Sequence, residues 1–426
     1  MRLASRVDRI DPFYVMEVAK TAAELSRTPM CDPAQGGRPM LYLNIGEPDE
    51  TAPAPVQAAA HRVIDDGRTG YTAATGLPEL RRALSGWYAH RFGLDIDPGR
   101  IIVTAGASAA LQLAMLALVD FGDEVLMPDP SYPCNRHFVT AAGGQARLLA
   151  TGAAERFQPT AAQVAQAWGP RTAGVLLASP SNPTGTSIDP TELAAIVGDV
   201  RRRGGWTAVD EIYLGLSYDP RYGGSALALG EDLISINSFS KTFGMTGWRL
   251  GWLVVPPDLV APLERLAQNL YICASTVAQR AALACFEPAT LQECERRREG
   301  FRRRRDYVVV ELERLGWPVP VPPDGAFYTW IDTSSIAADS WDLCHQLMHH
   351  AQLTLTPGRD FGPALASQFV RLSFASSMEV LRDAMHRLAS LDPQVLARPW
   401  QAATPLTDSV RMGAGSDGES GLGRRD

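Results

Sequence analysis

The chain has 426 residues, of which 46% are hydrophobic and 20% are charged, and its formal net charge is −7 at pH 7. That composition is typical of a folded globular protein and excludes a disordered or fibrous chain. The negative charge argues against a general affinity for nucleic acid or for acidic membranes. No apolar run approaches the roughly 20 residues that a membrane-spanning helix needs.

The six cysteines are scattered along the chain, and none forms a CxxC pair or a cluster with metal-ligand spacing. We therefore expect reduced thiols, no metal site and a cytoplasmic protein. The N-terminal residues MRLASRVDRIDPF lack the apolar core of a signal peptide, which favours the same location.

The first elements in chain order are a helix and a loop. Residues 11–25 have the periodicity of an amphipathic helix, and residues 28–40 are rich in Pro and Gly, which predicts a loop. From about residue 41, short apolar runs alternate with helical patterns. Such alternation predicts a mostly parallel sheet that helices cover on both faces. The expected strands lie in RIIVTAG, DEVLMPDP, AGVLLASPSNPTG, WTAVDEIY and DLISINSFSK.

The pattern changes after about residue 276. A long charged helix is predicted in RRREGFRRRRDYVVVELERL, and strands in DGAFYTWID and QFVRLSFA indicate a smaller α+β domain. An arginine-rich helix is compatible with nucleic-acid binding, but the interleaved acidic residues favour a solvated helix face. We expect an N-terminal helix and arm (1–45) that packs with the small domain, a large domain (46–275), the small domain (276–395) and a polar, disordered tail (396–426).

Candidate functional residues follow the predicted strands at their carboxyl ends. In an open parallel sheet, ligands bind outside these ends, so distant stretches of the chain should converge on one crevice. The residues in question are Gly106, Ala107, Ser108, Tyr132, Asn182, Asp210, Tyr213, Ser238 and Lys241.

Two residues of this set carry the chemistry, and each has two interpretations. Asp210, at the end of a buried strand, either caps the next turn or faces a cation such as the protonated ring nitrogen of pyridoxal phosphate. Lys241 is either an exposed loop lysine or the Schiff-base partner of an aldehyde, which requires a lowered pKa. Partial burial and the nearby Arg249 would both lower that pKa. Asn182 and Tyr213 carry neutral groups suited to a phenolate oxygen.

A separate group of residues is suited to an anion. Gly106-Ala107-Ser108 opens a helix directly after a strand, where free N–H groups and the helix dipole favour a phosphate. Ser238, Ser240 and Arg249 can add charge-assisted hydrogen bonds.

Arg371, in the apolar stretch VRLSFA, should have an anionic partner. That partner is either a structural carboxylate or the α-carboxylate of a substrate, which an arginine grips with two hydrogen bonds. The residues alone leave both alternatives open.

The stretch SFSKTFGMTGWRLG, from Ser238 to Gly251, resembles the pyridoxal phosphate attachment signature of the class I/II aminotransferases. The motifs NIGEPD, YTAATGLPELRRAL, SNPTG, DEIY, PDGAFY and RLSFA occur in the order of the family, and the resemblance covers roughly residues 10–395. It implies an α/β protein of pyridoxal phosphate-dependent transferase fold type I. Its large domain has a mostly parallel seven-stranded sheet flanked by helices, and its smaller domain is α+β.

The resemblance also implies residue roles. Lys241 would form the Schiff base with the cofactor, Asp210 would pair with the pyridine nitrogen, and Tyr132 would stack on the ring. Asn182 and Tyr213 would hold the ring hydroxyl. Lys241, Asp210 and Tyr213 are the expected catalytic residues.

Further roles concern the phosphate and the substrate. The residues implied for phosphate binding are Gly106, Ala107, Ser108, Ser238, Ser240 and Arg249. Tyr71 would reach the phosphate of a neighbouring subunit, so a homodimer with active sites at the subunit interface is expected. Gly46, Asn182 and Arg371 would bind the substrate carboxylate.

The implied reaction is ping-pong transamination between an L-amino acid and a 2-oxo acid. A C–S β-lyase on the same scaffold is an alternative, because a fold does not determine a reaction. A regulatory protein with a DNA-binding domain is disfavoured, since only about forty residues precede the motifs.

The substrate stays open. Ser108 occupies the position where relatives that prefer acidic substrates tend to carry lysine, which argues against aspartate. Arg136 and Arg359 are candidate second cations, and a neutral donor such as alanine or a broad range is equally open. Residues 28–40 resemble an insertion, and we expect them to modulate access to the active site.

Overall fold

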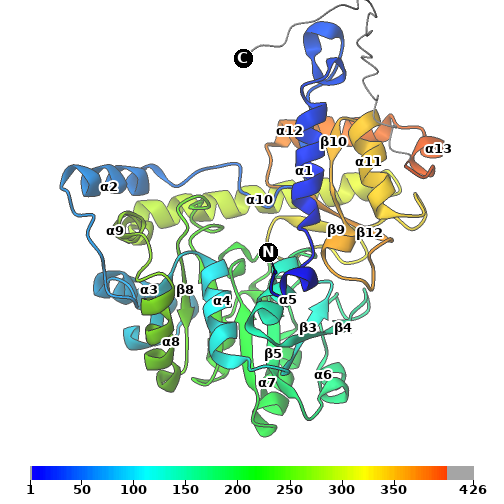
Figure 1. Cartoon of the computed structure of the whole chain (residues 1–426). Helices are drawn as coiled ribbons and strands as arrows, with labels where there is room; N and C mark the ends of the chain where they lie inside the picture. Colours follow the sequence, from blue (N-terminus) through cyan, green and yellow to red (C-terminus); the bar gives the residue numbers. More distant parts are fainter. Residues whose placement is uncertain (1, 401–426) are drawn as a thin grey trace, which may run out of the picture.

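The computed structural model describes residues 2–400. Its largest element is a seven-stranded sheet with strand order β2-β8-β7-β6-β5-β3-β4. Only β8 runs antiparallel to its neighbours, and the other pairs are parallel. The predicted fold, a mostly parallel seven-stranded sheet flanked by helices with a smaller α+β part, is therefore confirmed (Figure 1).

The bounds of the elements follow. The strands are β1 (Leu41–Tyr42), β2 (Ile101–Thr104), β3 (Glu124–Asp129), β4 (Gln145–Ala150), β5 (Thr172–Ala178), β6 (Trp206–Asp210), β7 (Ile234–Ser238), β8 (Gly251–Val254), β9 (Tyr328–Asp332), β10 (Leu353–Thr354), β11 (Thr356–Pro357) and β12 (Phe369–Ser373). The helices are α1 (Tyr14–Leu25), α2 (Ala54–Asp65), α3 (Pro78–Phe92), α4 (Ala107–Leu118), α5 (Pro133–Ala142), α6 (Ala161–Ala167), α7 (Pro190–Arg202), α8 (Pro257–Leu270), α9 (Thr276–Ala282), α10 (Pro288–Arg314), α11 (Ser340–His350), α12 (Met378–Ala389) and α13 (Pro393–Leu396).

Helices cover both faces of the large sheet, which explains the continuous apolar runs of its strands. Successive strand residues point to opposite faces. In β5, Leu176 packs with α4 and α8, whereas Val175 and Leu177 pack with α6 and α7. Both faces of this central strand therefore meet an apolar layer.

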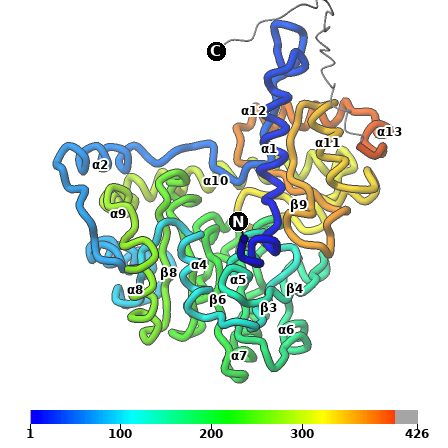
Figure 2. The backbone as a smooth tube through the Cα atoms, in the orientation of Figure 1, coloured from blue at the N-terminus to red at the C-terminus, as the bar shows by residue number. Residues whose placement is uncertain are grey.

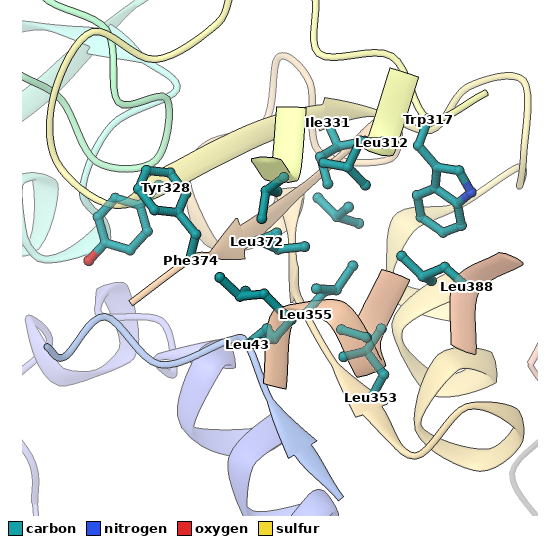
Figure 3. Packing of buried hydrophobic residues seen from close by; sticks show 14 of the residues in the cluster. Leu43, Leu312, Trp317, Tyr328, Ile331, Leu353, Leu355, Leu372, Phe374 and Leu388 are labelled. Carbon is teal, nitrogen blue, oxygen red and sulfur yellow. The ribbon is translucent and has the colours of Figure 1, made fainter. Parts of the chain in front are cut away.

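The smaller part contains an antiparallel three-stranded sheet with strand order β11-β12-β9. The N-terminal arm joins this part, because β1 pairs in parallel with β10, with Leu41 opposite Leu353. Leu43 continues from β1 into the apolar cluster, where it packs among Leu353, Leu355 and Leu372 (Figure 3).

Helix α1 starts later than residues 11–25 predict. It begins at Tyr14, after Phe13 in an extended conformation, and Pro12 disfavours helical geometry at Asp11. The loop over residues 28–40 forms two short 3₁₀ turns, and its Cys31 and Met40 are buried against Val18 and Ala22 of α1. Figure 2 shows the start of the chain beside α5 and this loop at the other end of α1.

Helix α10 links the two apolar cores. Its Cys294 packs in the core that contains α2, α3 and α9, whereas Phe301, Val308 and Leu312 pack in the core of the small sheet. The core thus changes within α10, between Cys294 and Phe301, and not at the boundary that we expected after residue 275. Figure 1 shows this long helix extending from beneath α2 toward the small part.

The arginine run of α10 is a solvated, ion-paired helix face, as predicted. Its arginines pair with acidic residues one turn away, such as Arg298 with Glu295 and Arg302 with Glu299. Arg304 reaches Asp49 in a two-bonded ion pair of 2.8 Å. These exposed pairs satisfy the arginines within the chain itself.

The boundary predicted for the disordered tail, residue 396, lies too early in the chain. Leu396 is buried in α13, and the indole of Trp400 stacks on the imidazoles of His345 and His349, with centroid distances of 5.4 and 4.4 Å. The disorder that we expect for the remaining tail concerns residues 401–426, which lie outside the described range. Within that range, no helix is long and apolar enough to cross a membrane.

We predict that Phe301→Ala lowers the free energy of unfolding by about 3–5 kcal/mol, because this ring is buried against Phe327 at a centroid distance of 5.5 Å. Val310→Ala on the exposed side of the same helix is the control and should change it by less than about 0.5 kcal/mol. Urea denaturation of both variants measures the difference, and equal losses would contradict the assignment of Phe301 to the small core.

Candidate functional site

A cavity of about 450 Å³ opens at the carboxyl ends of β5, β6 and β7, between the large sheet, α1 and the small sheet. It brings together most of the residues that the sequence singles out. The predicted residues that line it are Gly46, Ala107, Ser108, Tyr132, Asn182, Asp210, Tyr213, Ser238, Ser240, Lys241, Arg249 and Arg371. Distant motifs do therefore converge on one crevice.

Asp210 ends β6 and is 4% exposed. One carboxylate oxygen accepts a hydrogen bond from the Ile212 N–H at 3.1 Å, so the side chain does cap the next turn. No cation lies within ion-pair distance of it among the described residues. Burial raises its pKa to about 7, the Ile212 N–H lowers it, and the negative charge of Glu211 raises it further. The carboxylate thus remains available to a donor in the cavity.

Lys241 follows β7 and is partly buried, which excludes the exposed loop lysine. Its Nζ donates to the backbone oxygen of Gly46 at 2.7 Å. Burial lowers its pKa to about 8; Glu47 and Asp210 oppose this shift, whereas Arg371 and Arg249 add to it. More of the amine is therefore uncharged near neutral pH than in an ordinary lysine, as a nucleophile requires.

Arg371 is 3% exposed, and its guanidinium bonds only neutral groups. Nη1 donates to Asn182 Oδ1 at 2.7 Å, and Nη2 donates to the Asn44 oxygen at 2.6 Å and to Thr356 Oγ1 at 3.2 Å. Its Nε has no hydrogen-bond partner, and no carboxylate pairs with it in residues 2–400. The buried Asp360 is close enough for its charge to interact with that of Arg371, but no structural carboxylate among the described residues contacts the guanidinium, which stays available to a ligand.

The flat face of the same guanidinium lies over the ring of Tyr328, 4.4 Å from its centroid. Tyr328 is a site residue that the sequence reasoning missed, although the PDGAFY motif contains it. Its hydroxyl is 2.7 Å from the hydroxyl of Tyr213. Burial raises the pKa of Tyr213 well above its ordinary value, so both phenols stay neutral hydrogen-bonding groups.

The anion-binding corner is built by close backbone approaches. Gly106 precedes α4 with φ of +84°, and a Cβ there would lie 2.6 Å from Nη2 of Arg249. A Cβ on Gly251 would lie 2.7 Å from the Ala107 nitrogen. Ser238 Oγ accepts from the Ser240 N–H at 3.0 Å. The free N–H groups at the start of α4 therefore face a guanidinium and two hydroxyls, as a phosphate requires.

An apolar wall completes the cavity, and the sequence did not reveal it. Its residues are Phe13, Val15, Met16 and Ala19 at the start of α1, with Ile45 from the following arm. The amphipathic periodicity of α1 indicates an apolar face, but only the tertiary structure determines what that face covers.

Several predicted residues lie elsewhere. Tyr71 is 82% exposed and does not line the cavity of its own chain. Arg136 and Arg359 do not line it either. Arg136 donates to the backbone oxygen of Asp360 at 3.2 Å, and the guanidinium of Arg359 lies 4.6 Å from the centroid of the Trp341 ring. No residue of the 28–40 loop lines the cavity of its own chain, and its expected effect on access stays a prediction.

No group of three or more His, Cys, Asp or Glu side chains suited to a metal ion occurs in the described part of the chain. The six cysteines, all within that part, are free thiols.

Comparison with known proteins identifies relatives that match the chain across both of its apolar cores. Residues 38–388 match the family model described as aminotransferase class I and II. The chain is 38% identical over 390 residues to the valine–pyruvate aminotransferase of Mycobacterium tuberculosis, covering 90% of this chain and 97% of the relative. A solved aminotransferase from Mycobacterium tuberculosis superposes with a TM-score of 0.86 at 37% identity, covering 92% and 98% of the two chains. The solved Thermus thermophilus aspartate aminotransferase with maleate superposes with a TM-score of 0.84 at 34% identity, covering 91% of this chain and 99% of that chain.

We predict that Gly46→Ala is destabilising by about 1–3 kcal/mol, because its Cβ would overlap the Tyr328 hydroxyl. Tyr328→Phe removes the oxygen that the new Cβ would overlap. The double variant should therefore lose about 1 kcal/mol less stability than the sum of the two single losses. A double-mutant cycle measured by urea denaturation tests this, and strict additivity would contradict the close approach.

Proposed function

This chain belongs to the class I and II aminotransferases, pyridoxal phosphate-dependent enzymes of fold type I, and we propose that its amino donors are neutral aliphatic L-amino acids. It transfers the amino group of an L-amino acid to a 2-oxo acid. The alternative of a C–S β-lyase finds no support, because each relative named above is an aminotransferase.

Pyridoxal phosphate, when bound, supplies an aldehyde that condenses with amines and a ring that withdraws electrons. The cavity residues are suited to it. Asp210, with a buried carboxylate that has only one hydrogen bond, would face the ring nitrogen. Tyr213 and the amide of Asn182 would bind the ring hydroxyl, and Tyr132 would cover the ring.

The phosphate would bind in the corner where α4 begins. Gly106, Ala107 and Ser108 present the N–H groups of the helix start. Ser238, Ser240 and Arg249 would add hydroxyl and guanidinium donors.

Lys241 would anchor the cofactor and then carry the proton to and from the substrate Cα. Its pKa of about 8 lies close enough to neutral pH for both accepting and donating a proton. The 2.7 Å hydrogen bond to the Gly46 oxygen holds the amine at the edge of the cavity.

The observation that supports an amino acid as the substrate is the unpaired guanidinium of Arg371. A buried arginine without an anionic partner is costly unless a ligand supplies the charge. The α-carboxylate of an amino acid would do so and would lie beside Gly46 and Asn182. This arrangement would orient the Cα of the substrate toward Lys241.

The side chain of the donor would lie against the apolar wall. The cations that line the cavity are Lys241, Arg249 and Arg371, and each has one of the roles described above. Glu47 at the cavity edge would repel an acidic side chain. The valine–pyruvate aminotransferase of Mycobacterium tuberculosis supports the same class of donor by its name.

We predict that L-valine or L-alanine converts the yellow holoenzyme to its pyridoxamine form without any oxo acid, with a kcat/KM about 10²-fold above that of L-aspartate. Stopped-flow absorbance measures each rate. Lys241→Ala is the control and should show no conversion. Faster conversion by aspartate would overturn the donor class. Release of ammonia and pyruvate from an S-substituted cysteine, which carries a leaving group on its Cβ, would identify a C–S β-lyase.

The working unit that we propose is a cytoplasmic homodimer. Tyr71 is 82% exposed, and the exposed apolar side chains of Ile64, Leu270 and Ile272 occur on nearby elements. The Gly70 oxygen accepts a 2.7 Å hydrogen bond from Thr276, which holds the Tyr71 segment on α9. In the dimer, Tyr71 would reach the phosphate corner of the partner subunit. The six unpaired thiols favour a reducing compartment.

Hybrid dimers test the exchange of Tyr71 between subunits. Tyr71→Ala and Lys241→Ala are each expected to have low activity, but a mixed dimer has one site with an intact lysine and an intact tyrosine from the other chain. We predict that mixing equal amounts of the two variants under subunit exchange restores about one quarter of the wild-type activity, because about half of the dimers are then hybrids and each hybrid has one intact site of two. If Tyr71 acted within its own chain, the mixture would stay as inactive as its components.

A further inference from the structure

We propose that Asp360 is a positioning residue that sets the apolar wall of the substrate side-chain site by holding the first turn of α1. The inference rests on the proposed function, because it assigns the donor's side chain to that wall. Asp360 does not line the cavity and touches no candidate cofactor group.

The geometry is that of a helix cap supplied from a distant part of the chain. Both carboxylate oxygens of Asp360 are used: Oδ1 accepts from the Tyr14 N–H at 3.0 Å and Oδ2 accepts from the Val15 N–H at 3.2 Å. The N-cap residue of α1, Phe13, makes no side-chain cap hydrogen bond of its own. The first N–H groups of a helix need such acceptors, and a negative charge there is favourable.

The capped turn is the part of α1 that forms the wall. Phe13, Val15 and Met16 all line the cavity: Val15 carries one of the two bonded N–H groups, and Phe13 and Met16 flank the bonded pair. The second half of α1 is held differently, since Val18 and Ala22 pack in the cluster with Met348. Besides Asp360, the edge-on contact of Phe13 with Tyr132, at a centroid distance of 6.2 Å, ties the first turn to the site.

The segment that carries Asp360 also carries a partner of Arg371. Asp360 ends a 3₁₀ turn, Gly358–Asp360, directly after β11. In β11, Thr356 lies opposite Arg371 and accepts its 3.2 Å hydrogen bond. One short segment therefore fixes both the group that would bind the α-carboxylate and the wall that would meet the side chain. Their spacing determines which side-chain length fits.

Asp360 is fully buried and forms no ion pair within the described residues, so its carboxylate is a costly way to build a cap. Burial raises its pKa to about 6, while Arg371 and the two N–H groups lower it. Arg136 of α5 donates to the backbone oxygen of Asp360 and so holds the turn itself in place. A carboxylate this deeply buried has a fixed position, as a residue that sets the spacing between Arg371 and the apolar wall requires.

The test uses the holoenzyme with Asp360→Asn, which places an amide N–H₂ against one of the two helix N–H groups. We expect KM for L-valine to rise about tenfold, kcat to change less than about threefold, and the preference between L-valine and L-alanine to fall. The cofactor absorbance should not change. Amide exchange of residues 13–19 should become about tenfold faster, because the first turn of α1 opens more often.

Asp189→Asn is the matched control. Asp189 caps α7 through the Thr191 N–H at 2.9 Å, and neither residue lines the cavity. This variant should leave the valine-to-alanine preference and the exchange of residues 13–19 unchanged.

A second pair of variants probes the same hydrogen bond without altering Asp360. Proline is tolerated at the first helical position, so Tyr14→Pro removes the bonded N–H, whereas Tyr14→Ala removes only the side chain. We expect Tyr14→Pro to shift the valine-to-alanine preference in the direction of Asp360→Asn, and Tyr14→Ala to shift it less.

Two outcomes would overturn the inference: a lowered kcat with unchanged KM, or an unchanged donor preference in both Asp360→Asn and Tyr14→Pro. The wild-type enzyme tests the proposed donor class separately. If the wild type converts other donors better, the variants are compared on two of those donors that differ in side-chain length. Failure of the proposed donor class can then be distinguished from failure of the role of Asp360.

Discussion

The buried guanidinium of Arg371 joins the three parts of the chain that enclose the cavity. It reaches Asn182 in the loop after β5, Asn44 in the N-terminal arm and Thr356 in the small sheet. All three partners are neutral, so the hydrogen bonds orient the side chain without neutralising its charge. The cavity therefore has a fixed cation at the boundary between the large and small parts, and the other groups of the site are arranged around it.

Burial without ion pairing also explains the shifted pKa values of the two titratable groups at the centre of the cavity. Asp210 and Lys241 have opposite charges, yet no ion pair joins them among the described residues. Desolvation raises the pKa of the acid to about 7 and lowers that of the amine to about 8. Each group can change its protonation state near neutral pH at small cost, which is the condition for moving a proton. An ion pair between them would have removed this freedom.

Close packing sets the outline of the same cavity. Glycine at position 46 admits the hydroxyl of Tyr328, and glycine at position 106 admits the guanidinium of Arg249. Both glycines occur in motifs that the sequence analysis singled out, but for different reasons from those that the structure supplies. The motifs thus carry two kinds of information: which groups do chemistry, and where a side chain would obstruct them.

Most of the large sheet and most of the polar cavity residues were predictable from local signals. Apolar runs, turn residues and the position of Asp210 and Lys241 after strands depend on neighbours in sequence, and parallel topology brings strand ends together. The exclusion of Asp11 from α1 was also encoded locally, by Pro12.

Contacts between residues far apart in sequence were not predictable in this way. Nothing near Phe13 indicates that Asp360, 346 residues further on from Tyr14, caps its helix, or that α1 covers the cavity. The change of core within α10 has the same origin, since a continuous helical pattern does not reveal which partners pack on each half. The sequence by itself therefore determined the fold class and the chemical groups. Only the tertiary structure decided which surfaces meet, because burial and distant hydrogen bonds depend on the folded chain as a whole.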